Sequence, residues 1–291
     1  MDSQAFWAEA ERCRTLARSA LTRGKAKRKL AELCRAQDGD LTTRTEVAGL
    51  PITLDLKQGA DRAIYLFGTG DPRGVALIEK VMGRLDCRTA WDVGANRGNH
   101  AAFMRRHCRR LFAFEPNPFE HARLAALFTG DPAVTALQMG LSDRAGELPF
   151  LIDPENTGGA TFELEGRTPN AVSPVRTGDD VAAEYGVDDV DFAKIDVEGH
   201  EAHTLAGMRE LIARCRPVIV MELLEAQNTP ALGLPTLLPD YALYGNRTGL
   251  RSGITMGAYD LAPFQHGRTY MAMLCCPREK LDRFSELLPK G

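Results

Sequence analysis

The sequence predicts an α/β protein built on a doubly wound, mostly parallel β-sheet. Between residues 85 and 225, apolar stretches of strand length alternate with amphipathic stretches of helix length, the pattern of repeated strand–helix–strand units. Several of the apolar stretches end in a carboxylate or amide residue, as strands do at a ligand-binding sheet edge. With 291 residues, of which 44% are hydrophobic, the chain is long enough to bury a full core.

Residues 1–40 are predicted to form a helical extension. Phe6, Ala10 and Cys13 recur at helical spacing, whereas the other face is basic, with nine Lys and Arg against four acidic residues through Gln37. Such a face is more often simply solvated, but it also suits peripheral contact with anionic lipid or an acidic partner.

Residues 41–84 are predicted to lead into the main domain. Three short β-rich stretches, at 41–47, 52–56 and 63–67, are separated by glycine-containing turns and predict a small hairpin or edge structure. The apolar spacing over 75–82 predicts a helix.

The third predicted unit, residues 85–291, contains the sheet. Its strands are expected at 89–93, 111–115, 134–138, 191–196, 218–223 and 268–276. Its helices are expected at 99–107, 118–128, 179–185, 201–214 and 277–288. The stretches 153–173 and 226–260 are expected to be loop-rich and to form the pocket of the substrate, because long loops in a compact domain often serve as lids or binding loops.

Composition and charge exclude several classes of protein. A net charge of −3 gives no overall attraction to nucleic acid. No apolar stretch approaches the ~20 residues of a membrane span, and Met1 to Gln4 do not begin a signal peptide, so we expect a cytoplasmic protein. The seven cysteines include no C-x-x-C pair, which suits reduced thiols.

The stretch 92–99 (DVGANRGN) is the first predicted ligand-binding turn. A strand ends near Val93, Gly94 and Gly98 interrupt the pattern, and a helix follows. The glycines are not spaced as in the dinucleotide fingerprint, and Asp92 favours a cationic ligand over a pyrophosphate. We expect this cationic ligand to be a cofactor, and the residues expected to bind it are Asp92, Gly94, Asn96, Gly98 and Asn99.

Two further strand ends carry polar residues. Glu115 follows the glycine turn by about twenty residues, where a carboxylate can accept hydrogen bonds from both hydroxyls of a ribose. Asn117 follows it, where it is expected to cap the next helix and to lie at the cofactor. Ser142 and Asp143 follow the third strand, where they either hydrogen-bond an adenine edge or form a plain turn.

The fourth strand end is the most acidic. Asp196, Glu198, His200 and Glu201 lie within six residues, directly before a helix. Crowded carboxylates are costly unless a cation or protons offset the repulsion. A cationic cofactor would supply that charge, and so would a divalent metal.

Taken together, these stretches resemble one known family. The similarity rests on DVGANRG (92–98), FEPN (114–117), VDFAKIDVEGHE (190–201), LAG (205–207) and PVIVME (217–222). They are similar to the FkbM-type family of S-adenosylmethionine-dependent methyltransferases, although Gly178 departs from its usual Thr-Leu-Asp step. The resemblance implies S-adenosyl-L-methionine as cofactor and a seven-stranded, Rossmann-like sheet with one antiparallel strand. The implied activity is methyl transfer to a hydroxyl of a sugar, glycolipid or natural product.

Methyl transfer to a hydroxyl requires a base, and we expect Asp196 or His200 to accept the proton, with Glu198 as a further catalytic candidate. Asp196 is also expected to contact the cofactor. Asp196, Glu198 and Glu222 are an alternative divalent metal site that we do not favour. His200 and His203 are another pair of metal ligands by spacing, but solvated helix histidines are more common.

Two other classes of protein stay open. A nicotinamide-dependent oxidoreductase has a similar sheet, but the absent third glycine and Asp92 disfavour it. A non-catalytic S-adenosylmethionine-binding module is disfavoured by the acidic residues at 196–201. A small-molecule, sugar or glycolipid substrate is expected, and a nucleic-acid partner is not.

Overall fold

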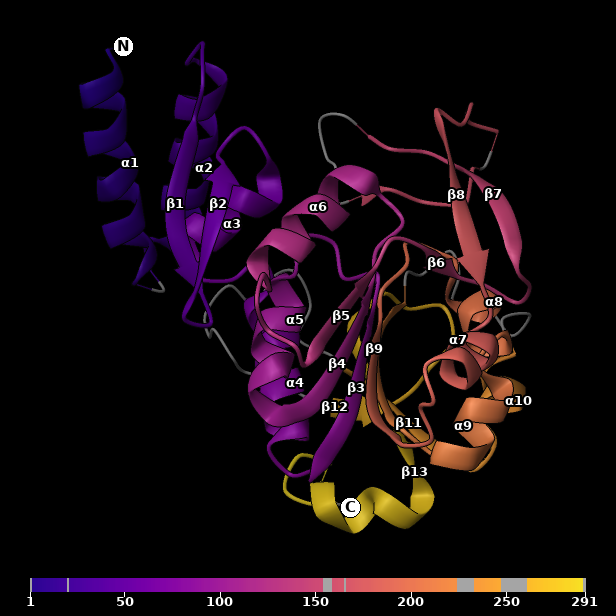
Figure 1. Cartoon of the computed structure of the whole chain (residues 1–291). Coiled ribbons are helices and arrows are strands. Elements are labelled where there is room, and N and C mark those ends of the chain that lie inside the picture. Colours follow the sequence, from indigo (N-terminus) through magenta and orange to yellow (C-terminus); the bar gives the residue numbers. More distant parts are fainter. Residues whose placement is uncertain are drawn as a thin grey trace.

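The computed structural model describes residues 2–19, 21–153, 159–164, 166–223, 233–246 and 261–289. Within this part of the chain, the main sheet has eight strands in the order β12-β11-β13-β10-β9-β3-β4-β5 (Figure 1). The strands are β3 (Cys87–Val93), β4 (Cys108–Phe114), β5 (Val134–Leu137), β9 (Val190–Ile195), β10 (Val218–Leu223), β11 (Tyr241–Asn246), β12 (Leu261–Pro263) and β13 (Tyr270–Pro277). The predicted α/β class is therefore confirmed.

The sheet is mostly parallel, as predicted. The five strands from β5 to β10 are parallel, whereas β13 runs antiparallel to both β10 and β11. The edge strand β12 is antiparallel to β11, so the described sheet has one strand more than the expected seven, and a second antiparallel one. The strand β11 falls where a loop was expected, and β12, directly after that loop, was not predicted; both are short and lack a strong alternation of apolar and polar residues.

Helices cover both faces of the sheet (Figure 1). One face carries α4 (Pro72–Met82), α5 (Asn99–Met104) and α6 (Pro118–Leu127), and the other carries α7 (Gly178–Glu184), α8 (Glu201–Ala206), α9 (Arg209–Cys215) and α10 (Leu234–Leu237). The residues of β4 are buried under the helices of both faces. Leu111 and Ala113 belong to one apolar cluster, and Phe112 and Phe114 belong to the other. A strand buried on both faces reads as a continuous apolar run.

The expected helix over 201–214 is in fact two helices. The break falls at Gly207, where a Cβ atom would lie 1.9 Å from the carbonyl oxygen of Ser142. The expected helix over 99–107 ends as a 3₁₀-helix, η1 (Arg105–His107), and the closing segment is the 3₁₀-helix η4 (Arg278–Phe284).

Residues 3–67 pack together in what we call the N-terminal unit. It consists of α1 (Ser3–Ala17), α2 (Arg23–Arg35), the hairpin β1 (Thr42–Val47) and β2 (Leu50–Asp55), and α3 (Gly59–Phe67). The hairpin confirms the prediction, but the expected strand at 63–67 is wrong, because those residues belong to α3, whose left-handed C-cap is Gly68. The predicted division of the chain at residues 40 and 84 stays a prediction.

A small second sheet stands beside the carboxyl edge of the main sheet (Figure 1). It pairs β6 (Gly140–Leu141), β8 (Ala171–Arg176) and β7 (Gly146–Phe150) in the order β6-β8-β7. Between β7 and β8, Leu151 and Thr161 form an isolated antiparallel bridge. The expected loop over 153–173 therefore ends in a strand, and residues 154–158 and 165 of it lie outside the described part.

The expected loop over 226–260 contains α10 and β11. Its residues 226–232 and 247–260 lie outside the described part of the chain. Every described helix is too short or too polar to cross a membrane.

Candidate active site at the carboxyl edge of the sheet

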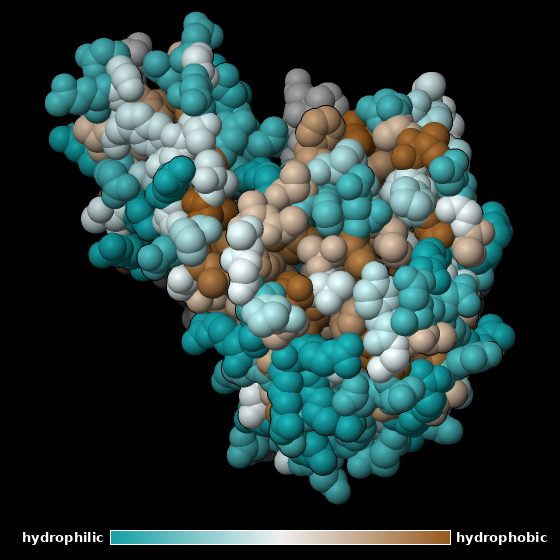
Figure 2. All heavy atoms as spheres, viewed as in Figure 1, coloured by the Kyte–Doolittle hydropathy of each residue, from teal (hydrophilic) through white to brown (hydrophobic). Residues whose placement is uncertain are grey.

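A pocket of about 400 Å³ opens at the carboxyl ends of β3, β4 and β9. Its floor is the turn after β3, and its walls come from the N-terminal unit, the small sheet and residues 159–164, which we call the strap. On the face shown in Figure 2, apolar and weakly polar residues gather in the middle, between the largely hydrophilic surfaces of the N-terminal unit and the lower part of the molecule. The strap is part of the loop over 153–173 that was expected to form the substrate pocket.

The two glycines of the turn serve packing between elements. Gly94 has a φ of +78°, and a Cβ atom there would lie 1.8 Å from the carbonyl oxygen of Asp196. A Cβ atom on Gly98, which has a φ of +92°, would lie 2.7 Å from a methyl carbon of Leu127. Neighbouring protein atoms alone therefore leave no room for a side chain at either glycine; Gly94 also lines the pocket, and the predicted role of both glycines in cofactor binding stays a prediction.

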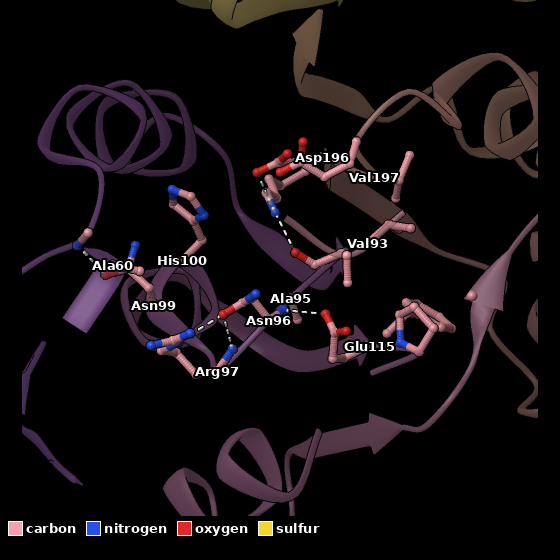
Figure 3. A pocket seen from close by; sticks show the side chains of 18 of the residues that line it. Ala60, Val93, Ala95, Asn96, Arg97, Asn99, His100, Glu115, Asp196 and Val197 are labelled. Atoms are coloured by element: carbon pink, nitrogen blue, oxygen red, sulfur yellow. Dashed lines mark hydrogen bonds and ion pairs between the residues drawn. The ribbon is translucent and has the colours of Figure 1, made fainter. Parts of the chain in front are cut away.

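Glu115 lies beside this turn and faces the pocket (Figure 3). Its carboxylate accepts hydrogen bonds from the backbone N–H of Asn96 (2.7 Å) and of Asn117 (2.8 Å). Burial raises the pKa of Glu115 to about 7, although both hydrogen bonds oppose the rise. Asn117 caps α6 as predicted, accepting from the N–H of Phe119 (3.0 Å), and its side chain is fully buried. Asn117 is not among the pocket-lining residues.

A buried lysine joins the strand ends of β3 and β9. The ammonium of Lys194 lies 3.2 Å from Asp92 and 3.3 Å from Asp196, and it donates to the carbonyl oxygen of Gly94 (2.8 Å). Burial alone would lower the pKa of Lys194, but Asp196 and Asp92 raise it. Asp92 is itself fully buried and faces this lysine beneath the pocket. Lys194 was not identified from the sequence as a site residue. A charged side chain inside an otherwise apolar strand could have pointed to it.

Three carboxyl groups crowd the end of β9 and the neighbouring β10. Asp196 and Glu198 line the pocket, and Glu198 has a left-handed φ of 51°. Burial, followed by the charge of Asp196, raises the pKa of Glu198 to about 7 and that of Glu222 to about 9. The site therefore contains more carboxyl groups than Lys194 can neutralise, and it suits a cationic ligand.

These raised pKa values predict that the protein loses stability as the pH rises. A carboxyl group whose folded pKa exceeds its usual 4.5 stabilises the fold at low pH, and this contribution disappears as the pH passes the folded pKa. The free energy of unfolding, measured by urea denaturation, should fall from about pH 4.5 to about pH 9, and Glu222→Gln should reduce that fall. The control Glu147→Gln, at an exposed residue, should leave the pH dependence of stability unchanged. Equal pH slopes in the wild type and Glu222→Gln would contradict the assignment.

His200 lies beside the pocket and is not one of its lining residues. Its Nδ1 atom is 2.9 Å from Glu163, in the strap, and its Nε2 atom is 2.9 Å from the hydroxyl of Ser142. Burial lowers the pKa of His200, against the opposing effect of Glu163. Asp143 lies 3.3 Å from Nδ1 of His203. The side chains of Ser142 and Asp143 thus contact imidazoles, whereas the backbone just before them, at residues 140–141, lines the pocket.

The opposite wall contains a second histidine–carboxylate pair that sequence reasoning missed. His100 lies 3.3 Å from Asp71, the N-cap residue of α4, and both line the pocket. The side-chain oxygen of Asn99 accepts from the N–H of Gly70 (2.8 Å) and the hydroxyl of Thr69 (3.0 Å). Asn99 therefore fixes the 69–71 segment. The Asp-Pro step was visible in the sequence, but it indicated only a turn.

A buried ionic network connects the glycine turn to the N-terminal unit. Arg97 pairs with Asp61 of α3 and with Glu120 of α6 (2.8 Å). Arg123 also pairs with Asp61 (2.6 Å), and Arg97 donates through Nε to the side-chain oxygen of Asn96 (2.9 Å; Figure 3). Asp61, Arg97 and Glu120 are all at most 1% exposed, so the centre of the network is buried, whereas Arg123 at its edge is partly exposed.

Comparisons with known proteins show which family the chain resembles. Residues 92–238, slightly more than half of the chain, match the family model for the Methyltransferase FkbM domain. The chain is 34% identical over 131 residues to the hexuronic acid methyltransferase AglP of Haloferax volcanii (45% of this chain, 54% of that protein). It is 30% identical over 176 residues to the 2-O-methyltransferase NoeI of Sinorhizobium fredii (52% of this chain, 71% of that protein).

Two further similarities involve another curated methyltransferase and a solved structure. The chain is 32% identical over 154 residues to the methyltransferase sdnD of Sordaria araneosa (41% of this chain, 60% of that protein). The chain thus spans less than two thirds of the length of AglP and of sdnD. A crystal structure of Methyltransferase FkbM from Methylobacillus flagellatus aligns with a TM-score of 0.45 at 18% identity (75% of this chain, 53% of that one).

Proposed function

This chain belongs to the FkbM methyltransferase family, and from that premise we propose that it transfers a methyl group from S-adenosyl-L-methionine to a hydroxyl group. The observation that supports the proposal most strongly is that Glu115 and Asp196, from two different strands, face one pocket. The acceptor that we propose is a sugar, a glycan or a natural product, since AglP and NoeI are named for a hexuronic acid and a 2-O position.

The pocket residues fit this cofactor in kind. Each oxygen of Glu115 accepts one backbone hydrogen bond and keeps a further lone pair, which would serve the ribose hydroxyls. The acidic side chains of Asp71, Asp196 and Glu198 would offset the positive charges of the sulfonium and the ammonium group. Phe150 and Phe162 would provide the apolar wall that a purine ring requires. The roles expected for Asn96 and Asn99 stay predictions.

When bound, S-adenosyl-L-methionine supplies an electrophilic methyl carbon, and the protein residues must position the acceptor and remove its proton. We assign proton removal to Asp196, which lines the pocket and is held 3.3 Å from Lys194. Glu198 is the second candidate. His200 is less suited as the base, because both of its ring nitrogens already face protein partners and it does not line the pocket.

Isothermal titration with S-adenosylhomocysteine, paired with the variant Glu115→Ala, tests the proposal. The wild type should bind, and Glu115→Ala should weaken binding by about 10–100-fold, because two hydrogen bonds to a charged group are lost. The exposed Glu147→Ala is the matched control and should bind normally. The ribose assignment fails if Glu115→Ala leaves the affinity unchanged.

The same titrations separate the competing functions. A folded protein that binds NADH and not S-adenosylhomocysteine would be an oxidoreductase. Binding of S-adenosylhomocysteine without transfer of labelled methyl to any of a panel of sugars and uronic acids would favour a non-catalytic module.

A further inference from the structure

Glu163, His200 and His203 converge next to the pocket and have no part in the proposed methyl transfer. One potential ligand atom from each lies within 4.8 Å of the others. His200 is 5% exposed, Glu163 is in the strap and His203 is on α8, so the three residues come from two separate segments of the chain. The spacing of the histidines alone gave no reason to include Glu163.

The two imidazole rings are oriented so that one nitrogen of each is held by an outer partner. Ser142 holds Nε2 of His200 (2.9 Å), and Asp143 holds Nδ1 of His203 (3.3 Å). The rings are stacked with centroids 4.6 Å apart and planes 21° from parallel, so the half-exposed ring of His203 must turn out of the stack before both lone pairs can meet one ion. The nitrogen of His200 without an outer partner is Nδ1, which faces Glu163 at 2.9 Å.

The outer partners of the two rings are of the kind that metal-binding histidines have. Metal-ligating imidazoles almost always donate their second N–H to a carboxylate, hydroxyl or carbonyl oxygen, which fixes the tautomer and the orientation of the ring. Here the outer partners are themselves joined, since the hydroxyl of Ser142 is 3.2 Å from Asp143. An ordinary histidine–carboxylate ion pair would need only Glu163 and His200, and it gives no reason for the second, separately oriented ring.

We propose that Glu163, His200 and His203 form a binding site for a divalent transition metal ion, most suitably Zn²⁺. Two imidazoles and one carboxylate are a set of ligands typical of zinc, whereas Mg²⁺ and Ca²⁺ prefer oxygen ligands alone. This set of ligands shares no residue with the carboxyl cluster of Asp196, Glu198 and Glu222, and it contains two nitrogen ligands where that cluster has only oxygen ligands.

The site would attach the strap to the turn between β9 and α8. Thr161 already donates to the carbonyl oxygen of Glu198 (2.8 Å), and Phe162, between Thr161 and Glu163, lines the pocket. A bound ion would fix the strap at a second point. If the proposed function holds, loading the metal should therefore also tighten cofactor binding, but metal binding itself does not depend on that function.

The test is titration of Zn²⁺, and of Co²⁺ as a spectroscopic probe, into the untagged full chain. A Cys215→Ser background removes the half-buried thiol, which could bind these ions by itself. We expect one equivalent of Zn²⁺ by calorimetry and a cobalt spectrum without a thiolate charge-transfer band. His203→Ala should abolish this binding, and Asp143→Asn should weaken it by about 10–100-fold, as loss of an outer partner does.

The control is His107→Ala, a histidine also paired with a carboxylate (Glu79, 3.6 Å) but located in η1, at the amino end of β4. It should bind the metal as the wild type does. The proposal is overturned if the wild type binds no stoichiometric ion, or if His203→Ala and Glu163→Gln, both shown to be folded by circular dichroism, keep the wild-type affinity.

Discussion

Asp61→Ala is expected to lower the free energy of unfolding by about 3–5 kcal/mol, the usual cost of removing one partner from a buried ionic network. Asp61 is fully buried and pairs with both Arg97 and Arg123. It also accepts a hydrogen bond from the N–H of Asp55 (2.7 Å). The variant would leave the guanidinium group of Arg97 inside the protein with Glu120 as its remaining carboxylate partner among the ion pairs described.

Urea denaturation at neutral pH measures this loss. The matched control is Asp86→Ala, which breaks an ion pair with Arg109 in which both side chains are more than half exposed. Exposed pairs contribute at most about 1 kcal/mol, so the control should change little. A loss below about 1 kcal/mol for Asp61→Ala would mean that Glu120 alone suffices to hold Arg97.

Asp196→Asn is expected to lower kcat by about 10²–10⁴-fold, the typical contribution of a positioned general base. Asparagine keeps the shape of the side chain and can still face Lys194, but it cannot accept the proton of the acceptor hydroxyl. The affinity for S-adenosylhomocysteine should fall less than kcat, because this product lacks the sulfonium charge that Asp196 would offset and Glu115 is untouched.

Steady-state kinetics with labelled methyl donor, together with calorimetry of cofactor binding, distinguish the two effects. The exposed Asp180→Asn, in the first turn of α7, serves as the control and should retain wild-type kcat. If Asp196→Asn keeps nearly full turnover and Glu198→Gln loses it, the base is Glu198.

Much of the sheet could be predicted because its central strands are buried on both faces. The runs at 89–93, 111–115 and 218–223 are almost uninterrupted apolar stretches, and β3, β4 and β10 occupy nearly the same residues. In contrast, residues 63–67 (AIYLF) are rich in residues that favour strands, yet they form a helix. Local preference was overridden there by packing, since Ile64, Tyr65 and Leu66 are buried in the core cluster.

In the candidate site, only residues that directly follow an apolar strand could be predicted from the sequence. Glu115, Asp196 and Glu198 were visible because each follows an apolar run. The partnership of Lys194 with Asp92 depends on the register of β3 against β9, in which these two residues are paired, and no local pattern encodes that register. The contributions of Asp71 and Glu163 depend likewise on segments that are distant in the sequence.

The pocket has a floor and walls of different origin, and this has an evolutionary consequence. The floor is bound together by Lys194, which ties two strands and the glycine turn into one rigid piece. The walls come from other segments, with the N-terminal unit, residues 70–71 and α5 on one side and the small sheet and the strap on the other. If the proposed function holds, mutations could therefore remodel the walls for new acceptors while the floor continues to hold the methyl donor.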